Sequence, residues 1–97
     1  MLGTPIHDVT DVQNLGEYRL HLVFADGAEG DVDVSRLIEF RGIFEPLRDA
    51  REFERVRVDP EAGTIVWPNG ADLDPLVLYA AVTKKSIESL LASAPVR

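Results

Sequence analysis

The side chains best suited to chemistry are the two histidines, because imidazole titrates near neutral pH. His7 and His21 lie in stretches predicted to be neighbouring strands, with Asp8, Asp11 and Asp33 nearby in the sequence. A histidine beside an aspartate can act in acid–base catalysis or hold a metal ion. No motif spacing supports either role, and histidines are common on the solvent-exposed face of a sheet. We therefore predict surface histidines, and keep a hydrolase or metal-dependent enzyme using these residues as an alternative.

A second group of polar side chains, Asn69, Asp72 and Asp74, offers oxygen atoms that hard cations prefer. The group has too few ligands for a calcium loop of the EF-hand type. Asp74 is followed by Pro75, the order typical of a helix N-cap and first helical position. Turn formation and helix capping therefore explain these residues better than a metal site does.

Other catalytic patterns are absent from the sequence. It has no Gly-X-Ser-X-Gly elbow, P-loop or dinucleotide-binding glycine pattern, and Ser86 and Ser89 lie on a predicted helix without a base beside them. It has no cysteine, which excludes a thiol nucleophile, a thiolate metal site and a disulfide. We expect a protein that is not an enzyme, with no catalytic residue, cofactor or metal.

The rest of the chain is organised around the stretch from residue 65 to residue 75. Residues 64–67 are β-prone, Pro68 ends the strand or confines it to an edge, and Asn69-Gly70 predicts a turn. We expect the Trp67 indole to pack over the core with its N–H bonded to a carbonyl. The alternative is a small-ligand module in which Trp67, Tyr79 and residues 69–74 line a cleft. The candidate interaction or ligand surface is Trp67, Asn69, Asp72 and Tyr79.

The first half of the chain predicts a β-meander. Residues 6–12 form a first strand whose broken alternation indicates a bulge, and residues 13–16 form a turn. Residues 17–24 alternate apolar and polar. A three-residue loop with Gly27 in the left-handed region pairs residue 22 with 30 and 20 with 32, which keeps the apolar side chains of residues 28–34 on one face.

Short helices, a hairpin and a C-terminal helical segment follow. Ser35 can cap a short helix over residues 36–40. Residues 43–47 predict a compact turn or a single 3₁₀ turn, and residues 49–53 predict one more helical turn. Residues 53–58 and 64–67 predict a β-hairpin. After Pro75 the spacing of apolar residues predicts a helix. Thr83 or Ser86 could cap a second helical segment, so the sequence allows either one helix or two in this region. The expected fold is α+β, an antiparallel sheet of about five strands covered by this segment.

The chain length and the net charge limit the classes of function that are expected for this protein. Ninety-seven residues predict a single domain over 1–97, and 45% apolar residues supply a core. A net charge of −7 with scattered basic residues disfavours direct nucleic-acid binding and favours a basic protein partner. No apolar run approaches the ~20 residues that cross a bilayer, and no signal peptide is evident, so we expect a cytoplasmic protein without membrane contact. Unpaired sheet edges make a homodimer a further expectation.

Several short sequence segments occur together in a particular order. They are residues 20–24 followed by Asp26-Gly27, residues 32–34, Phe53 with Val56 and Val58, and residues 67–75 with Tyr79 shortly after. Over roughly residues 6–80 the chain resembles the bacterial family of small proteins labelled domain of unknown function 2442. The Trp-Pro-Asn-Gly stretch is the most specific part of the resemblance.

The resemblance implies a small α+β domain with an antiparallel sheet and no established activity, so no catalytic residue carries over. It also implies a gene neighbourhood with small toxin-like proteins. Some relatives continue into a helix-turn-helix domain, which we do not expect in this chain. The sequence thus favours a non-catalytic protein-interaction or regulatory module, an antitoxin-like partner of a neighbouring toxin-like protein.

Overall fold

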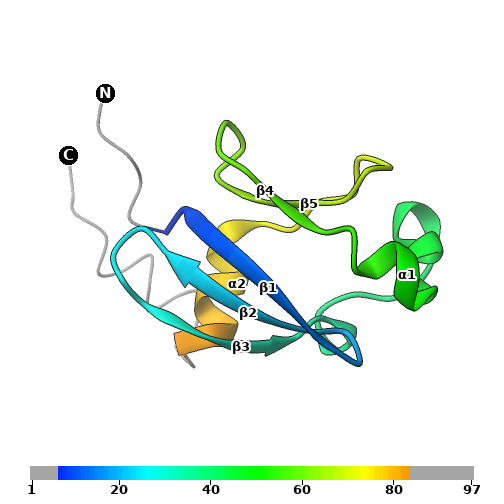
Figure 1. The fold of residues 1–97 in the computed structure, drawn as a ribbon, viewed down its shortest axis with the longest axis horizontal. Coiled ribbons are helices and arrows are strands. Elements are labelled where there is room, and N and C mark those ends of the chain that lie inside the picture. The colour runs from blue at the N-terminus through cyan, green and yellow to red at the C-terminus, as the bar shows by residue number, and fades with distance from the viewer. Residues whose placement is uncertain (1–6, 84–97) are drawn as a thin grey trace.

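The computed structural model describes residues 7–83, which form a mixed α+β domain (Figure 1). The strands are β1 (Val9–Gly16), β2 (Arg19–Phe24), β3 (Glu29–Asp33), β4 (Arg57–Asp59) and β5 (Thr64–Val66). The helices are α1 (Ala50–Phe53) and α2 (Pro75–Thr83), with 3₁₀ helices η1 (Val34–Arg36) and η2 (Gly42–Arg48) between β3 and α1. The predicted α+β class is confirmed.

The prediction of one sheet with about five strands is wrong. The order β1-β2-β3 forms one antiparallel sheet, and β4-β5 forms a separate two-stranded hairpin. The hairpin lies beside β1 (Figure 1) and is joined to it by a backbone hydrogen bond from Val9 N–H to Gly63 O, 3.0 Å. Both hairpin strands are only three residues long, with Pro60 and Pro68 nearby. They therefore offer few backbone N–H and C=O groups that could extend the hydrogen-bond ladder of the main sheet.

The predicted register between β2 and β3 is confirmed. Phe24 N–H donates to Ala28 O at 2.8 Å, and Gly27 has a φ of +93°. Leu22 lies opposite Gly30, and residue 20 lies opposite residue 32. Because partners across two strands share a face, the apolar side chains of both strands point into the core.

The boundary between β1 and β2 differs from the prediction. The expected bulge exists, between Val9 and residue 11, but residues 13–16 continue β1 and do not turn. The turn is made by Glu17 and Tyr18, which have φ values of 55° and 64° without being glycine. The Tyr18 ring packs edge-on against Phe53 and its hydroxyl donates to the carbonyl of Arg48. These tertiary contacts offset the steric cost of the left-handed conformation, about 1–2 kcal/mol per residue.

The segment between the two sheets agrees in part with the prediction from the sequence. The predicted helix over residues 36–40 capped by Ser35 is wrong, because Asp33 accepts the Ser35 N–H at 3.0 Å and starts η1 two residues earlier. The predicted 3₁₀ turn is present as η2. The predicted helical turn is α1, where Asp49 accepts the N–H of Arg51 at 2.9 Å.

Helix α2 begins as the sequence predicted. The Asp74 carboxylate accepts the N–H of Leu76 at 2.8 Å, and Pro75 is the first helical residue. The helix packs on β3, where a Cβ on Gly30 would lie 2.9 Å from Cγ1 of Val82. Glycine therefore permits the close approach. The second segment predicted after Thr83 or Ser86 lies outside the described residues.

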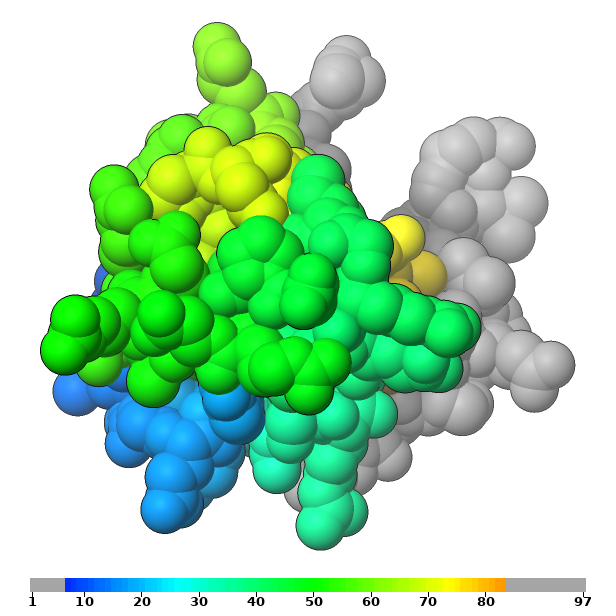
Figure 2. All heavy atoms as spheres, turned by 90° about the vertical axis from the view of Figure 1, so that its right-hand side faces the viewer, coloured from blue at the N-terminus to red at the C-terminus, as the bar shows by residue number. Residues whose placement is uncertain are grey.

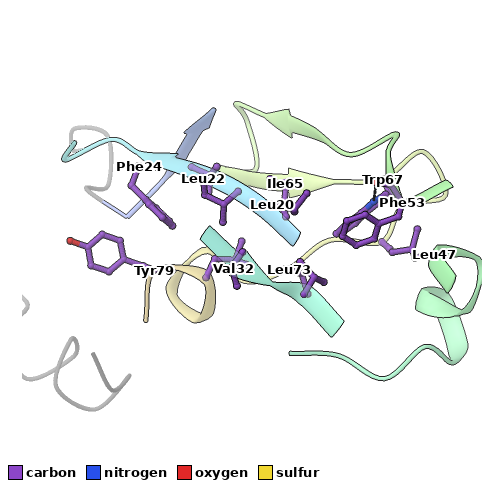
Figure 3. Close-up of a cluster of buried hydrophobic side chains, with 14 of the residues drawn as sticks. Leu20, Leu22, Phe24, Val32, Leu47, Phe53, Ile65, Trp67, Leu73 and Tyr79 are labelled. Carbon is purple, nitrogen blue, oxygen red and sulfur yellow. Dashed lines mark hydrogen bonds between the residues drawn. The ribbon is translucent and has the colours of Figure 1, made fainter. Parts of the chain in front are cut away.

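One hydrophobic core lies between the three-stranded sheet, α2 and the hairpin (Figure 3). Trp67 and Phe53 lie at one end of it, and Tyr79 and Phe24 lie at the other. The largest fully buried side chains are Trp67, Phe24, Phe53, Leu20, Leu22, Leu47, Ile65, Leu78 and Val34. The opposite face of the three-stranded sheet carries the polar side chains of β1, β2 and β3.

Candidate functional site

His21 lies on the polar face of the sheet, between two carboxylates of β3. Its Nδ1 is 2.8 Å from Oδ1 of Asp31, and its Nε2 is 2.9 Å from Oε1 of Glu29. Asp31 lies directly opposite His21 in the ladder, and Arg19 approaches the same carboxylate at 3.8 Å. The imidazole side chain is 30% exposed, so this group is accessible to solvent.

The two carboxylates favour the charged imidazole. A ring nitrogen facing a carboxylate must carry a proton to donate, and both nitrogens do so only in the imidazolium. The hydrogen bonds to Asp31 and then to Glu29 accordingly raise the pKa of His21 above its ordinary value. An imidazolium held in this way has no free lone pair for a general base or a metal ligand.

His7 occupies a different place. Its ring packs on Tyr79, with ring centroids 4.3 Å apart, and Tyr79 packs edge-on against Phe24 on the core side of the sheet. His21 points to the opposite face, because successive side chains of a strand alternate. The structure therefore does not bring the two histidines into one site.

Tyr79 and Asp26 form a charged hydrogen bond at the His7 end of the core. The Tyr79 hydroxyl donates to Oδ2 of Asp26, and the N–H of Ala28 donates to the other carboxylate oxygen at 2.9 Å. Partial burial raises the pKa of Asp26, but these donors outweigh it and the pKa lies below its ordinary value. The same hydrogen bond, together with burial, raises the pKa of Tyr79.

The three aspartates predicted near the histidines have separate surroundings. Asp8 lies against Gly63, where a Cβ would come within 2.5 Å of its carboxylate. Asp33 caps η1 and lies 3.7 Å from the guanidinium of Arg36. Asp11 lies opposite Val23 and shares the polar face with His21. Among residues 7–83, no three histidine, cysteine, aspartate or glutamate side chains are placed to hold a metal ion.

The four residues predicted as an interaction or ligand surface do not lie together. Trp67 is 1% exposed, its Nε1 donates to the carbonyl of Phe53 at 2.9 Å, and Tyr79 lies at the other end of the core (Figure 3). The expected burial of the indole, with its N–H on a carbonyl, is confirmed. Trp67 and Tyr79 thus do not line a common cleft.

Asn69 and Asp72 lie on the exposed turn after β5. The Asn69 side chain donates to the carbonyl of Ile43 at 2.8 Å and accepts the N–H of Ala71, so it ties the turn to η2. Asp72 forms a bridge with Val66, which folds the chain back along β5. These contacts give the Asn-Gly turn a structural role, and Asp72 presents an exposed carboxylate beside it.

Sequence reasoning missed the two carboxylates that hold His21. Glu29 and Asp31 were not singled out, although the predicted register already placed residue 31 opposite residue 21. The signal was therefore present in the sequence. Applying the register to the polar face as well as to the apolar face would have identified Asp31 as the partner of His21.

Comparison with known families gives one result. The family model described as a protein of unknown function (DUF2442) matches residues 9–84. The chain belongs to this family. The resemblance stated from the sequence is thereby confirmed, and the matched range contains both sheets and α2. No curated protein and no solved structure matches the chain.

The description of the DUF2442 family names no activity. The described part of the chain contains no helix that is both long and apolar enough to cross a membrane.

Proposed function

We propose that this DUF2442 protein is a non-catalytic interaction domain that binds a basic protein partner. The observation that carries the proposal is an excess of exposed carboxylates that form no ion pair within the described part of the chain. Arginines accompany Asp31, Asp33, Glu39 and Glu52. Glu17, Glu54, Glu61 and Asp72 are exposed, and none forms an ion pair within residues 7–83.

The state of the candidate catalytic groups supports the same proposal. Both ring nitrogens of His21 are engaged by carboxylates, and His7 lies on the other side of the sheet against Tyr79. General acid–base catalysis needs a base within hydrogen-bond reach of the reacting proton. A surface of unneutralised carboxylates suits instead the electrostatic attraction of a positively charged protein.

The partner that we propose is a small basic protein encoded beside this one, which the domain would bind in the manner of an antitoxin. Coexpression of the two proteins followed by size-exclusion chromatography tests the proposal. We expect a complex that weakens severalfold as the salt concentration rises, because screening shortens the reach of exposed charges. We also expect the domain to rescue growth that the partner alone inhibits.

Two variants of the hairpin region provide a matched control. Asp72→Asn removes an exposed acid and should weaken the complex, whereas Arg57→Gln removes an exposed base and should not weaken it. Val66 lies opposite both residues, so the two changes sample the same part of the surface. Absence of a complex together with absence of growth rescue would refute the proposal.

A further inference from the structure

Strand β3 lies at an edge of the three-stranded sheet. Within residues 7–83 it pairs with β2 on one side, and no strand lies beyond it on the other. At its start the N–H of Phe24 donates to the carbonyl of Ala28 at 2.8 Å. Because hydrogen-bonded pairs alternate along an antiparallel ladder, Gly30 and Val32 also turn their N–H and C=O groups toward β2. A short edge strand held by few bonds is among the parts of a fold that open most easily.

The two ends of β3 are fixed by contacts that do not respond to pH near neutrality. At the start, Asp26 accepts a hydrogen bond from the hydroxyl of Tyr79 on α2. The pKa of Asp26 is lowered and the pKa of Tyr79 is raised, so neither group changes its charge near neutral pH. At the far end, the N–H of Val34 donates to the carbonyl of Tyr18 at 2.9 Å. Figure 2 shows the blue β1–β2 turn beside the blue-green segment that follows β3.

His21 holds the middle of β3 through both of its ring nitrogens. Its Nδ1 lies 2.8 Å from Asp31, and its Nε2 lies 2.9 Å from Glu29. The imidazolium donates two hydrogen bonds, whereas the neutral imidazole has one N–H and one lone pair. Loss of the proton therefore removes one of the two bonds between the strands. It also leaves one carboxylate facing a lone pair, which repels it.

The other charged groups on this face are carboxylates and guanidinium groups, which as classes titrate far from neutral pH. Gln13 of β1 lies directly opposite His21 and carries no charge. The charged residues that face His21 are Asp11 from β1, Arg19 from β2, Glu29, Asp31 and Asp33 from β3, and Arg36 from η1 beside Asp33. The imidazole is thus the group of this face that can change its charge near neutrality.

We propose that His21 is a proton-dependent clip for the edge strand: the charged imidazole holds β3 on β2, and loss of its proton lets β3 separate from β2 more often. The hydrogen bonds to Asp31 and then to Glu29 raise the pKa of His21. The clip is therefore fully closed below the ordinary value of about 6.5 and is released as pH rises through the folded value. The inference is independent of the proposed function, since it concerns a motion of the domain itself.

Hydrogen exchange of single amides tests the clip in the full chain. The amides of Gly30 and Val32 are measured by NMR at pH values about 1.5 units below and above the imidazole pKa titrated in the same sample. Protection factors remove the intrinsic pH dependence of exchange. We expect protection of both amides to fall about threefold at the higher pH, the range of one exposed ion pair. The Trp67 amide, which donates to Ala71 at 2.9 Å in the hairpin region, should keep its protection.

Three variants separate the clip from general charge effects. His21→Gln has no titrating group and should abolish the change. Glu29→Gln should also abolish it, because the glutamine amide can donate to the lone pair of the neutral imidazole while the other nitrogen still donates to Asp31. Arg19→Gln is the matched control, because it removes a charge 3.8 Å from Asp31 but keeps both bonds of His21. All three replaced side chains are partly exposed, so the variants should fold.

Each contrary result would overturn the clip. Protection of Gly30 and Val32 that stays constant across the imidazole titration would show that the proton does not hold β3. A change that persists in His21→Gln, or that disappears in Arg19→Gln, would assign the effect to other charges. An equal change at Trp67 would show that the proton affects unfolding of the whole domain and not the edge strand alone.

Discussion

The two ends of the hydrophobic core are closed by different kinds of hydrogen bond. At one end the Trp67 indole, 1% exposed, donates to the backbone carbonyl of Phe53 and packs against its ring (Figure 3). At the other end the Tyr79 hydroxyl donates to the Asp26 carboxylate, and the ring packs against His7 and Phe24. The first bond joins two neutral groups, and the second joins the core to a titratable surface charge.

The difference between the two ends predicts how the stability of the domain should depend on pH. A neutral bond in a dry environment is insensitive to pH, and its loss leaves a buried carbonyl unpaired. A bond to an ionised carboxylate is worth most when that carboxylate is charged. The Trp67 end should therefore control the total stability, while the Tyr79 end should control its dependence on acid.

The largest effect is expected from Trp67→Phe. This change keeps an aromatic ring but removes the donor to the Phe53 carbonyl and leaves space in the core. The two losses together should lower the free energy of unfolding by about 2–4 kcal/mol. Urea denaturation at pH 7 and pH 4 measures the loss, which should be the same at both values. A loss that disappears at pH 4 would contradict the distinction between the two ends.

Asn14→Leu should change stability in the opposite direction. Asn14 lies beside Phe53, and its buried Oδ1 has no hydrogen-bond partner among the described residues. Replacing it by an apolar side chain of similar volume should raise the free energy of unfolding by about 1 kcal/mol. Thermal denaturation of the variant and wild type at equal concentration measures the change. A clear drop in melting temperature would show that Asn14 has a structural partner.

Tyr79→Phe should lower stability by about 1 kcal/mol at pH 7, since it removes one hydrogen bond to a partly exposed group. Asp26 has a pKa below its ordinary value in the folded protein. Its contribution is therefore present above the unfolded pKa of about 3.9 and is lost as pH falls through the lower folded pKa. The difference between variant and wild type should shrink below about pH 3. A difference that stays constant down to pH 2 would contradict the carboxylate's role.

The smallest effect is expected at His21, which lies on the polar face and outside the core. Its folded pKa is raised, so its stabilising contribution is complete below the unfolded pKa of about 6.5 and is lost as pH rises through the folded value. His21→Gln should flatten this dependence, because glutamine does not titrate, and it should change the stability least at a pH above the folded pKa, where the imidazole is neutral in both states. An NMR titration of the imidazole in wild type provides the direct measurement. A pKa at or below the ordinary value would remove the basis for the expectation.

Local chemistry was enough to predict several elements of this fold. The start of α2 followed from Asp74-Pro75, because a carboxylate and a fixed φ act within one turn. The register of β2 and β3 followed from apolar alternation, because a slip by one residue would expose every apolar side chain. The burial of Trp67 followed from its size and its single donor.

Other features depend on residues far apart in the chain. Glu17 and Tyr18 adopt positive φ because Tyr18 is held by Phe53 and the carbonyl of Arg48, about thirty residues away. The β4–β5 hairpin packs beside β1 but forms its own sheet, because within residues 7–83 a single backbone hydrogen bond, from Val9 to Gly63, joins it to β1. The local propensities of residues 13–16 favour a turn there. The contacts of Tyr18 with distant residues place the turn at residues 17 and 18 instead.

The sequence by itself determined the α+β class, the family, the β2–β3 register and the cap of α2, because each depends on neighbours in the chain or on one face of one hairpin. The tertiary structure alone decided that Tyr79 meets Asp26, fifty-three residues away, and that Asn14 lies beside Phe53. Such pairs are selected by the packing of whole elements against one another, and packing has no short-range pattern in the sequence.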